Sequence, residues 1–155
     1  MTYITDDNPI PSIPPIEEAP PVRTEEELHQ RWRALMGPGG FSRHSLWVIW
    51  FGHDHRQLPV IVPIDDLPGE LTSADIGQLA TMMQSAVADA DAGSVALLLS
   101  RPGPSAISDQ DKARANTLLH TLGQLTARGA FTLRLWPIHL ATSDSVRQLT
   151  VDDLA

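Results

Sequence analysis

Two apolar stretches decide the fold: SLWVIWF at residues 45–51 and SVALLLS at residues 94–100. Each is apolar on both faces that a strand presents, which is typical of a strand buried inside a sheet. Residues 58–64, LPVIVPI, follow after a short polar segment and predict the returning strand of a hairpin. Pro59 and Pro63 favour an edge position or a bulge for this returning strand, because proline has no N–H to donate to a neighbour.

Three segments with helical apolar periodicity flank these strands, at about residues 25–36, 73–92 and 108–128. Thr24 and Glu27 predict a capping box at the start of the first helix. Its apolar stripe is expected to dock on the rest of the domain, and the alternative is that this helix is a docking arm for a partner.

A last strand is predicted at residues 130–141, so the element order is α-β-β-α-β-α-β. A hairpin followed by strand–helix–strand units predicts a mixed β-sheet with helices on its faces. We therefore expect a single domain of the α/β (α+β) class.

A length of 155 residues suits one domain. Most of the net charge of −8 lies at the two ends of the chain. Residues 1–22 hold six of the 13 prolines and four acids, and we expect them to form a disordered Pro-rich acidic tail. The tail is expected to be inert, with a proline motif at Pro11 and Pro14 as the alternative. Residues 23–149 are expected to form the domain, and residues 150–155 an acidic C-terminal tail.

The composition excludes several classes of function. Most of the net negative charge lies at the two ends, and residues 23–149 are close to neutral with no basic cluster, so we expect no nucleic-acid partner. No apolar run reaches the roughly 18 residues of a membrane span, and no signal-peptide pattern opens the chain, so we expect a cytoplasmic protein without a membrane partner. Cysteine is absent, which excludes disulfides and thiolate chemistry. No cofactor is expected, and the sequence leaves the oligomeric state open.

The loop that joins the second apolar strand to the third helix is the best candidate site. A helix N-terminus attracts anions, and Arg101, Ser105 and Ser108 could add a guanidinium and two hydroxyls. The alternative is purely structural: Ser108 caps the helix, and Asp111 completes a capping box.

His53 and His55 are weak candidates for a metal site, because two imidazoles two residues apart share one face of a strand. They fall at the predicted hairpin tip, where polar residues are common. A third ligand would have to come from elsewhere in the chain, such as His139. We expect no metal here.

Residues from about 46 to 142 resemble the JAB/MPN-type domain, especially its RadC-like branch. The resemblance rests on the order of elements and on two segments, LWVIWFGHDHRQLPVIVPI and SVALLLSRPGPSAISDQDKA. Active members of that superfamily carry His-x-His-Pro and then Ser-x-x-Asp after such a strand. In them the two histidines and the aspartate bind zinc, while the serine and an upstream glutamate assist hydrolysis.

The resemblance implies an inactive member. Pro102, Ser108 and Asp111 match the family pattern, but Leu99 and Arg101 stand at the histidine positions. Neither side chain can replace an imidazole ligand, and the charge of Arg101 would repel a dication. His139 resembles a histidine in the last strand of RadC-like members.

The leading hypothesis is a non-enzymatic protein-interaction or assembly module with an as yet unidentified protein partner. The candidate binding residues are Arg101, Ser105, Ser108, Asp111 and His139, with Trp32 if the first helix is a docking arm. The alternative is a small-anion-binding protein or a metal-dependent hydrolase that uses loop 101–111 or the His53/His55 pair. A further alternative is a structural subunit that pairs through residues 58–64.

Overall fold

The two apolar stretches lie side by side at the centre of the sheet in the computed structural model, which describes residues 19–37 and 41–155. β1 (Ser45–Gly52) runs antiparallel to β3 (Ala92–Ser100), and Trp47 lies opposite Leu98. Both strands are buried over most of their length, because helices cover both faces of the sheet. The prediction of two central strands is confirmed.

The sheet is mixed, with the order β2-β1-β3-β5-β6. β2 (Gln57–Ile64) runs antiparallel to β1 at one edge, as the hairpin prediction required. β5 (His139–Ala141) runs parallel to β3, and β6 (Val146–Gln148) closes the other edge antiparallel to β5. A short β4 (Arg134–Leu135) pairs with the beginning of β3.

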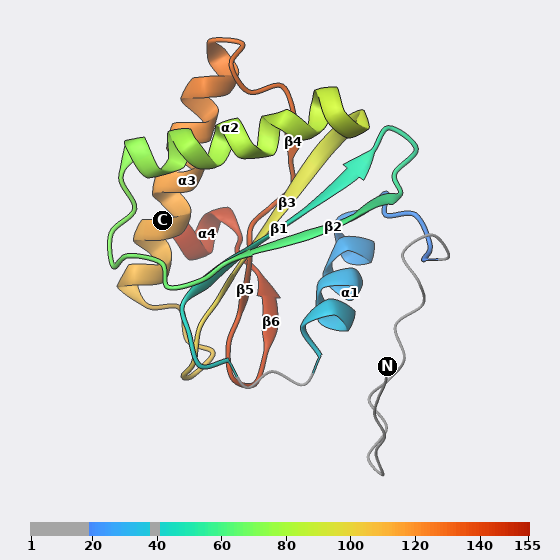
Figure 1. Ribbon diagram of the computed structural model, residues 1–155. Helices are drawn as coiled ribbons and strands as arrows, with labels where there is room; N and C mark the ends of the chain where they lie inside the picture. The colour runs from blue at the N-terminus through green and yellow to red at the C-terminus, as the bar shows by residue number, and fades with distance from the viewer. Residues whose placement is uncertain (1–18, 38–40) are drawn as a thin grey trace.

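Helices lie on both faces of this sheet (Figure 1). α2 (Ser73–Ala90) and α3 (Asp109–Ala127) cover one face, and α4 (Val151–Leu154) lies against α3. α1 (Glu25–Met36) lies on the opposite face, near β6. The predicted single α/β domain with helices on both faces is confirmed.

Alternate residues of the strands divide the interior into two cores. In β1, Leu46, Val48 and Trp50 point toward α2 and α3 into the large core, whereas Ile49 and Phe51 point toward α1 into the small core. The large core also includes Ile76, Met83, Leu97, Leu99, Leu118, Leu122, Phe131 and Leu140. The small core includes Val22, Leu28, Trp32, Ala96, Leu98, Trp136 and Ala141.

The three long helices begin with the same local device. Thr24, Thr72 and Ser108 each accept a hydrogen bond from the backbone N–H three residues on, and the acid at that position bonds back to the cap. The predicted capping box at Thr24 and the predicted helix 25–36 are confirmed.

The strand predicted at residues 130–141 is wrong as one continuous element. It forms β4 and β5, which are separated by residues 136–138. The backbone N–H of Trp136 still donates to Val95 O, but the register against β3 shifts by one residue between the Ser94–Arg134 pair and the Leu98–His139 pair, so the ladder is interrupted there.

Both ends of the domain differ from the prediction. Residues 1–18 of the expected tail lie outside the described residues. Residues 19–22 do not behave as a tail, since Val22 joins the small core and its N–H donates to His55 O at 2.8 Å. Residues 150–155 hold α4 instead of a tail, because Thr150 caps that helix and Leu154 packs against the large core.

Candidate functional site

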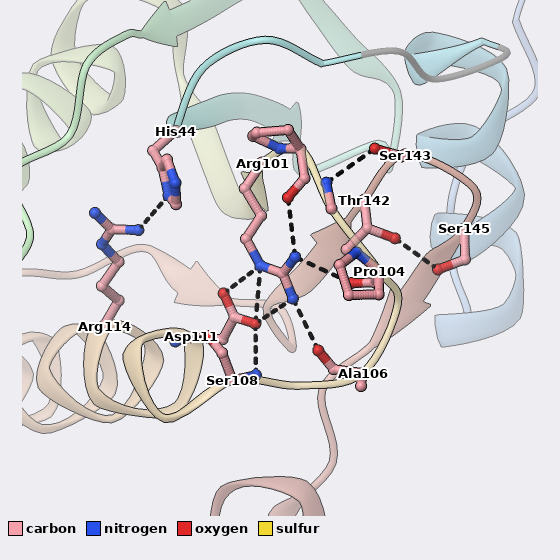
Figure 2. Close-up of polar contacts among 12 residues, drawn as sticks. His44, Arg101, Pro104, Ala106, Ser108, Asp111, Arg114, Thr142, Ser143 and Ser145 are labelled. Atoms are coloured by element: carbon pink, nitrogen blue, oxygen red, sulfur yellow. Dashed lines mark hydrogen bonds and ion pairs between the residues drawn. The ribbon is translucent and has the colours of Figure 1, made fainter.

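Arg101 and Asp111 form an ion pair at the end of β3. Their residues are 8% and 2% exposed. Arg101 Nε donates to Asp111 Oδ1 at 2.9 Å, and Nη2 donates to Oδ2 at 2.7 Å (Figure 2). Two parallel N–H···O bonds make this the strong, bidentate form of the pair.

The other donors of Arg101 go to its own loop. Nη1 donates to the carbonyls of Pro102 and Pro104 at 3.1 and 3.0 Å, and Nη2 also donates to the carbonyl of Ala106 at 2.8 Å. A guanidinium has five N–H groups, and all five are used. Arg101 therefore has no donor left for a bound anion, and our expectation that it offers a charged fork to a ligand is not met.

Asp111 and Ser108 also use their polar atoms within the protein, through hydrogen bonds to each other. Asp111 Oδ2 accepts from Ser108 N–H at 2.9 Å, while Ser108 Oγ accepts from Asp111 N–H at 3.1 Å. Burial opposes the charged form of Asp111, but the hydrogen bonds from Arg101 and Ser108 outweigh burial and hold the pKa of Asp111 below its ordinary value. The structural alternative for this pair, a helix cap, is the one that the geometry shows.

Gly103 connects this loop to the turn between β5 and β6 through two hydrogen bonds. Its N–H donates to Ser143 Oγ at 2.9 Å, and its carbonyl accepts from Ser143 N–H at 3.2 Å. Its φ is +102°, and a Cβ there would lie 3.3 Å from Arg101 Nη1, so glycine fits both the backbone and the crowding. Ser105 lies half-buried in the same loop.

A second buried arginine, Arg114, lies one turn along α3. Its Nη1 lies 2.8 Å from His44 Nδ1, and its Nη2 donates to Pro68 O at 2.7 Å. Burial, together with the charges of Arg114 and Arg101, lowers the pKa of His44. Arg114 and His44 are not among the predicted site residues, although Arg114 falls within the apolar stripe of its helix, which was the available signal.

His139 and Trp32 lie on the other side of the sheet from the loop. His139 pairs with Leu98, whose side chain belongs to the small core, so the histidine faces α1. Trp32 extends from α1 into the same core and is fully buried. The predicted site residues therefore form two separate groups: Arg101, Ser105, Ser108 and Asp111 in the loop, and His139 with Trp32 beneath α1.

The His139 imidazole is completely enclosed. Its Nδ1 lies 3.3 Å from Pro137 O, its ring stacks on that of His29 with 5.6 Å between centroids, and its Nε2 has no hydrogen-bond partner among the described residues. Burial is the main reason that the pKa of His139 falls to about 4; His29 lowers it further, whereas the Pro137 carbonyl and Glu25 raise it.

A shallow cleft lies beside this histidine pair, between α1 and β6. Its volume is about 380 Å³, and its lining includes Glu25, Glu26, His29, Val146, Arg147 and Gln148. Gln148 Nε2 donates to Glu25 Oε1 at 3.0 Å across it.

His53 and His55 lie at the tip of the hairpin that β1 and β2 form. His53 Nε2 lies 3.6 Å from Asp91 Oδ1, with both side chains exposed. His55 has a φ of +69°, and its carbonyl accepts from Val22. Within residues 19–37 and 41–155, no three His, Asp or Glu side chains gather closely enough to hold a metal ion.

Six apolar side chains that are only partly buried pack against the small core. We call this set the apolar rim; it consists of Leu35, Met36, Phe41, Trp47, Ile61 and Val146, all packed against the small core. Pro63 lies opposite Trp47 in the β1–β2 ladder and is exposed, so it extends the same apolar surface.

No protein-family model matches the chain, and no curated protein matches it. None of the helices in the described part of the chain is both long and apolar enough to cross a bilayer. The fold and the contacts above define the class of protein: a single α/β domain with a mixed sheet.

Proposed function

We propose that the protein is a non-enzymatic interaction module that binds an apolar segment of a protein partner at the apolar rim. The observation that carries this proposal is the rim itself, six half-buried apolar side chains that pack against a small core. Apolar side chains that remain accessible to solvent can form a protein-binding surface.

The mode of contact follows from β2. Pro63 lies opposite Trp47 in the ladder although it has no N–H, so it belongs to a pair that needs no hydrogen bond and its nitrogen faces the open edge. Pro59 lies four residues away, on the same face. A partner strand would find few donors at this edge, and we propose that the partner instead packs side chains onto the face of the sheet.

The resemblance to inactive JAB/MPN-type domains supports the same proposal. At the two positions where active members have zinc-binding histidines, Leu99 lies in the large core and Arg101 is paired with Asp111. The matched serine and aspartate cap a helix, and no other carboxylate or imidazole of the described residues joins them in a metal-binding group.

The experiment is a capture from cell extract with four versions of the full chain: wild type, Met36→Lys, Ile61→Lys and Val151→Lys. Met36 and Ile61 belong to the apolar rim, whereas Val151 is 87% exposed and lies on α4, on the opposite face. We expect a protein that wild type and Val151→Lys retain equally and that both rim variants lose by at least about tenfold. Circular dichroism checks that all four versions are folded.

Equal capture by all four versions, or capture of nothing above background, overturns the proposal. Zinc retained through dialysis by wild type but not by a His53→Gln/His55→Gln variant would favour the hydrolase alternative.

A further inference from the structure

His139 is a buried histidine that α1 covers. The strand places it on the α1 face, where it is fully buried and stacked on His29 of the helix. If Nδ1 donates to Pro137 O, as the 3.3 Å contact indicates, Nε2 carries a lone pair that faces no donor among the described residues. Nε2 is therefore the atom at which a further proton would add.

We propose that protonation of His139 at Nε2 releases α1 from the sheet, so that the helix is a pH-sensitive cover of the small core. A new N–H at this position would have no acceptor, and a charged imidazolium would lie in an apolar enclosure; both are costly. Separation of α1 exposes the ring to water and removes both costs. This inference does not depend on a partner binding at the apolar rim.

Other polar groups at the same interface favour its opening. Trp32 Nε1 and Gln57 Nε2 are also buried without a hydrogen-bond partner in the described part of the chain. Arg31 of α1 opposes opening through its hydrogen bonds to Gln57 Oε1 at 2.8 Å and to Pro20 O, although its burial, which also lowers its pKa, favours opening. Water reaches all of these groups when α1 leaves, whereas the contacts within α2 and α3 are unaffected.

The groups that face His139 set the direction of the effect. From α1, His29 opposes a positive charge on His139, and Glu25 favours that charge. Glu26 of α1 and Arg147 of β6 line the neighbouring cleft. Gln148, opposite His139 in β6, is uncharged, and Leu98 of β3 is apolar. Glu25 thus moderates the switch and His29 reinforces it.

The size of the effect follows from the two protonation states. The pKa of His139 is about 4 with α1 in place, against 6.5 for an ordinary histidine. The ratio of released to docked α1 then rises about 20-fold between pH 7 and pH 5, and about 100-fold between pH 7 and pH 4.

Amide hydrogen exchange tests this on the full chain, with rates corrected for their intrinsic pH dependence. We expect protection of residues 25–36 to fall about 20-fold between pH 7 and pH 5, and to stay below the protection of residues 109–127 in α3 at both pH values, because α1 separates while α3 remains folded. His139→Gln removes the titrating group and should make the protection of α1 independent of pH. His53→Gln changes an exposed histidine at the hairpin tip and should leave the response intact.

Constant protection of α1 across this range overturns the proposal, as does an undiminished response in His139→Gln. Equal protection of α1 and α3 at each pH also overturns it, because that result means that α1 opens only when the whole domain unfolds. If His139→Gln does not fold, NMR of the wild-type chain decides: the His139 ring should titrate together with the loss of docked α1 signals, and titration with α1 still docked contradicts the proposal.

Discussion

The two faces of the sheet are built from alternate residues of the same strands, yet they are closed in different ways. α2 and α3 seal one face over a large apolar core, and Trp50 on that face donates to Met83 O. On the other face, one helix of 12 residues covers a smaller core, with partly buried apolar side chains around it. Three of the four buried nitrogens without a partner among the described residues belong to that second face. The α2/α3 face is therefore closed by the larger apolar core, whereas the α1 face combines a smaller core with most of the unpartnered buried nitrogens of the described residues.

The largest expected effect concerns the ion pair at the end of the closed face. Asp111→Ala leaves the Arg101 guanidinium buried without its carboxylate and removes half of a capping box. We expect the free energy of unfolding to fall by about 3–5 kcal/mol, measured by urea denaturation. Asp109→Ala removes an exposed acid of the same helical turn and should cost less than about 1 kcal/mol. Equal losses would show that the pair does not stabilise this face.

A matched pair of leucines compares the two cores directly. Leu97→Ala in the large core should lower the free energy of unfolding by about 2–5 kcal/mol. Leu28→Ala in α1 removes the same atoms, but the helix can separate without global unfolding, so part of the loss should appear as faster hydrogen exchange in α1. Equal global losses, without selective exchange in α1, would contradict the difference between the faces.

Lowering the pH should reduce the free energy of unfolding in two separate pH ranges. The pKa of His139 is depressed in the folded state, to about 4 from 6.5, so the unfolded chain takes up the proton first. Its contribution, on the order of 3 kcal/mol, is present above pH 6.5 and is lost as the pH falls toward 4. The pKa of Asp111 is also lowered, so its contribution is lost only below its ordinary value of 3.8.

Urea denaturation at pH 7, 5, 4 and 3 measures the loss in both ranges. His139→Gln should remove the loss in the upper pH range except for the part due to His44, whose pKa is also lowered by burial. The loss of stability in the lower pH range, which is due to Asp111, should persist in His139→Gln and become smaller in Asp111→Ala. A wild-type stability that is constant from pH 7 to pH 4 would refute the role given to His139.

The smallest expected effect comes from two equivalent helix caps. Thr72→Ala at α2 should lower the free energy of global unfolding by about 1 kcal/mol. Thr24→Ala at α1 breaks the same kind of capping box, but its effect should appear mainly as faster exchange of α1 amides. Similar global losses for both variants would indicate that α1 unfolds together with the sheet.

Local sequence signals predicted most of the fold. The two apolar stretches placed β1 and β3, and the caps at Thr24 and Ser108 placed α1 and α3 to within about a residue of their starts. The prediction of one last strand failed because residues 130–133 do not pair and because the register against β3 shifts by one residue between β4 and β5. Pairing is decided by the neighbour across the sheet, which the periodicity of one segment does not specify.

The candidate site was less predictable, because its contacts join residues through the tertiary structure. The choice of loop 101–111 brought Arg101, Ser108 and Asp111 together correctly, but the arginine turned out to bind its own loop. A signal was present: Pro102 and Pro104 supply carbonyls without N–H groups, and a neighbouring arginine is well suited to satisfy them. His139 gave no such signal, since its burial depends on the register with Leu98 and on α1 docking above it.

The single guanidinium of Arg101 also predicts which changes this chain will accept over evolution. Lysine at this position would keep the charge but present three donors on one nitrogen, too few and too localised for a carboxylate and three separate carbonyls. Drifted homologues should therefore retain arginine and aspartate ten positions apart, with serine three residues before the aspartate, even where the rest of the loop has changed.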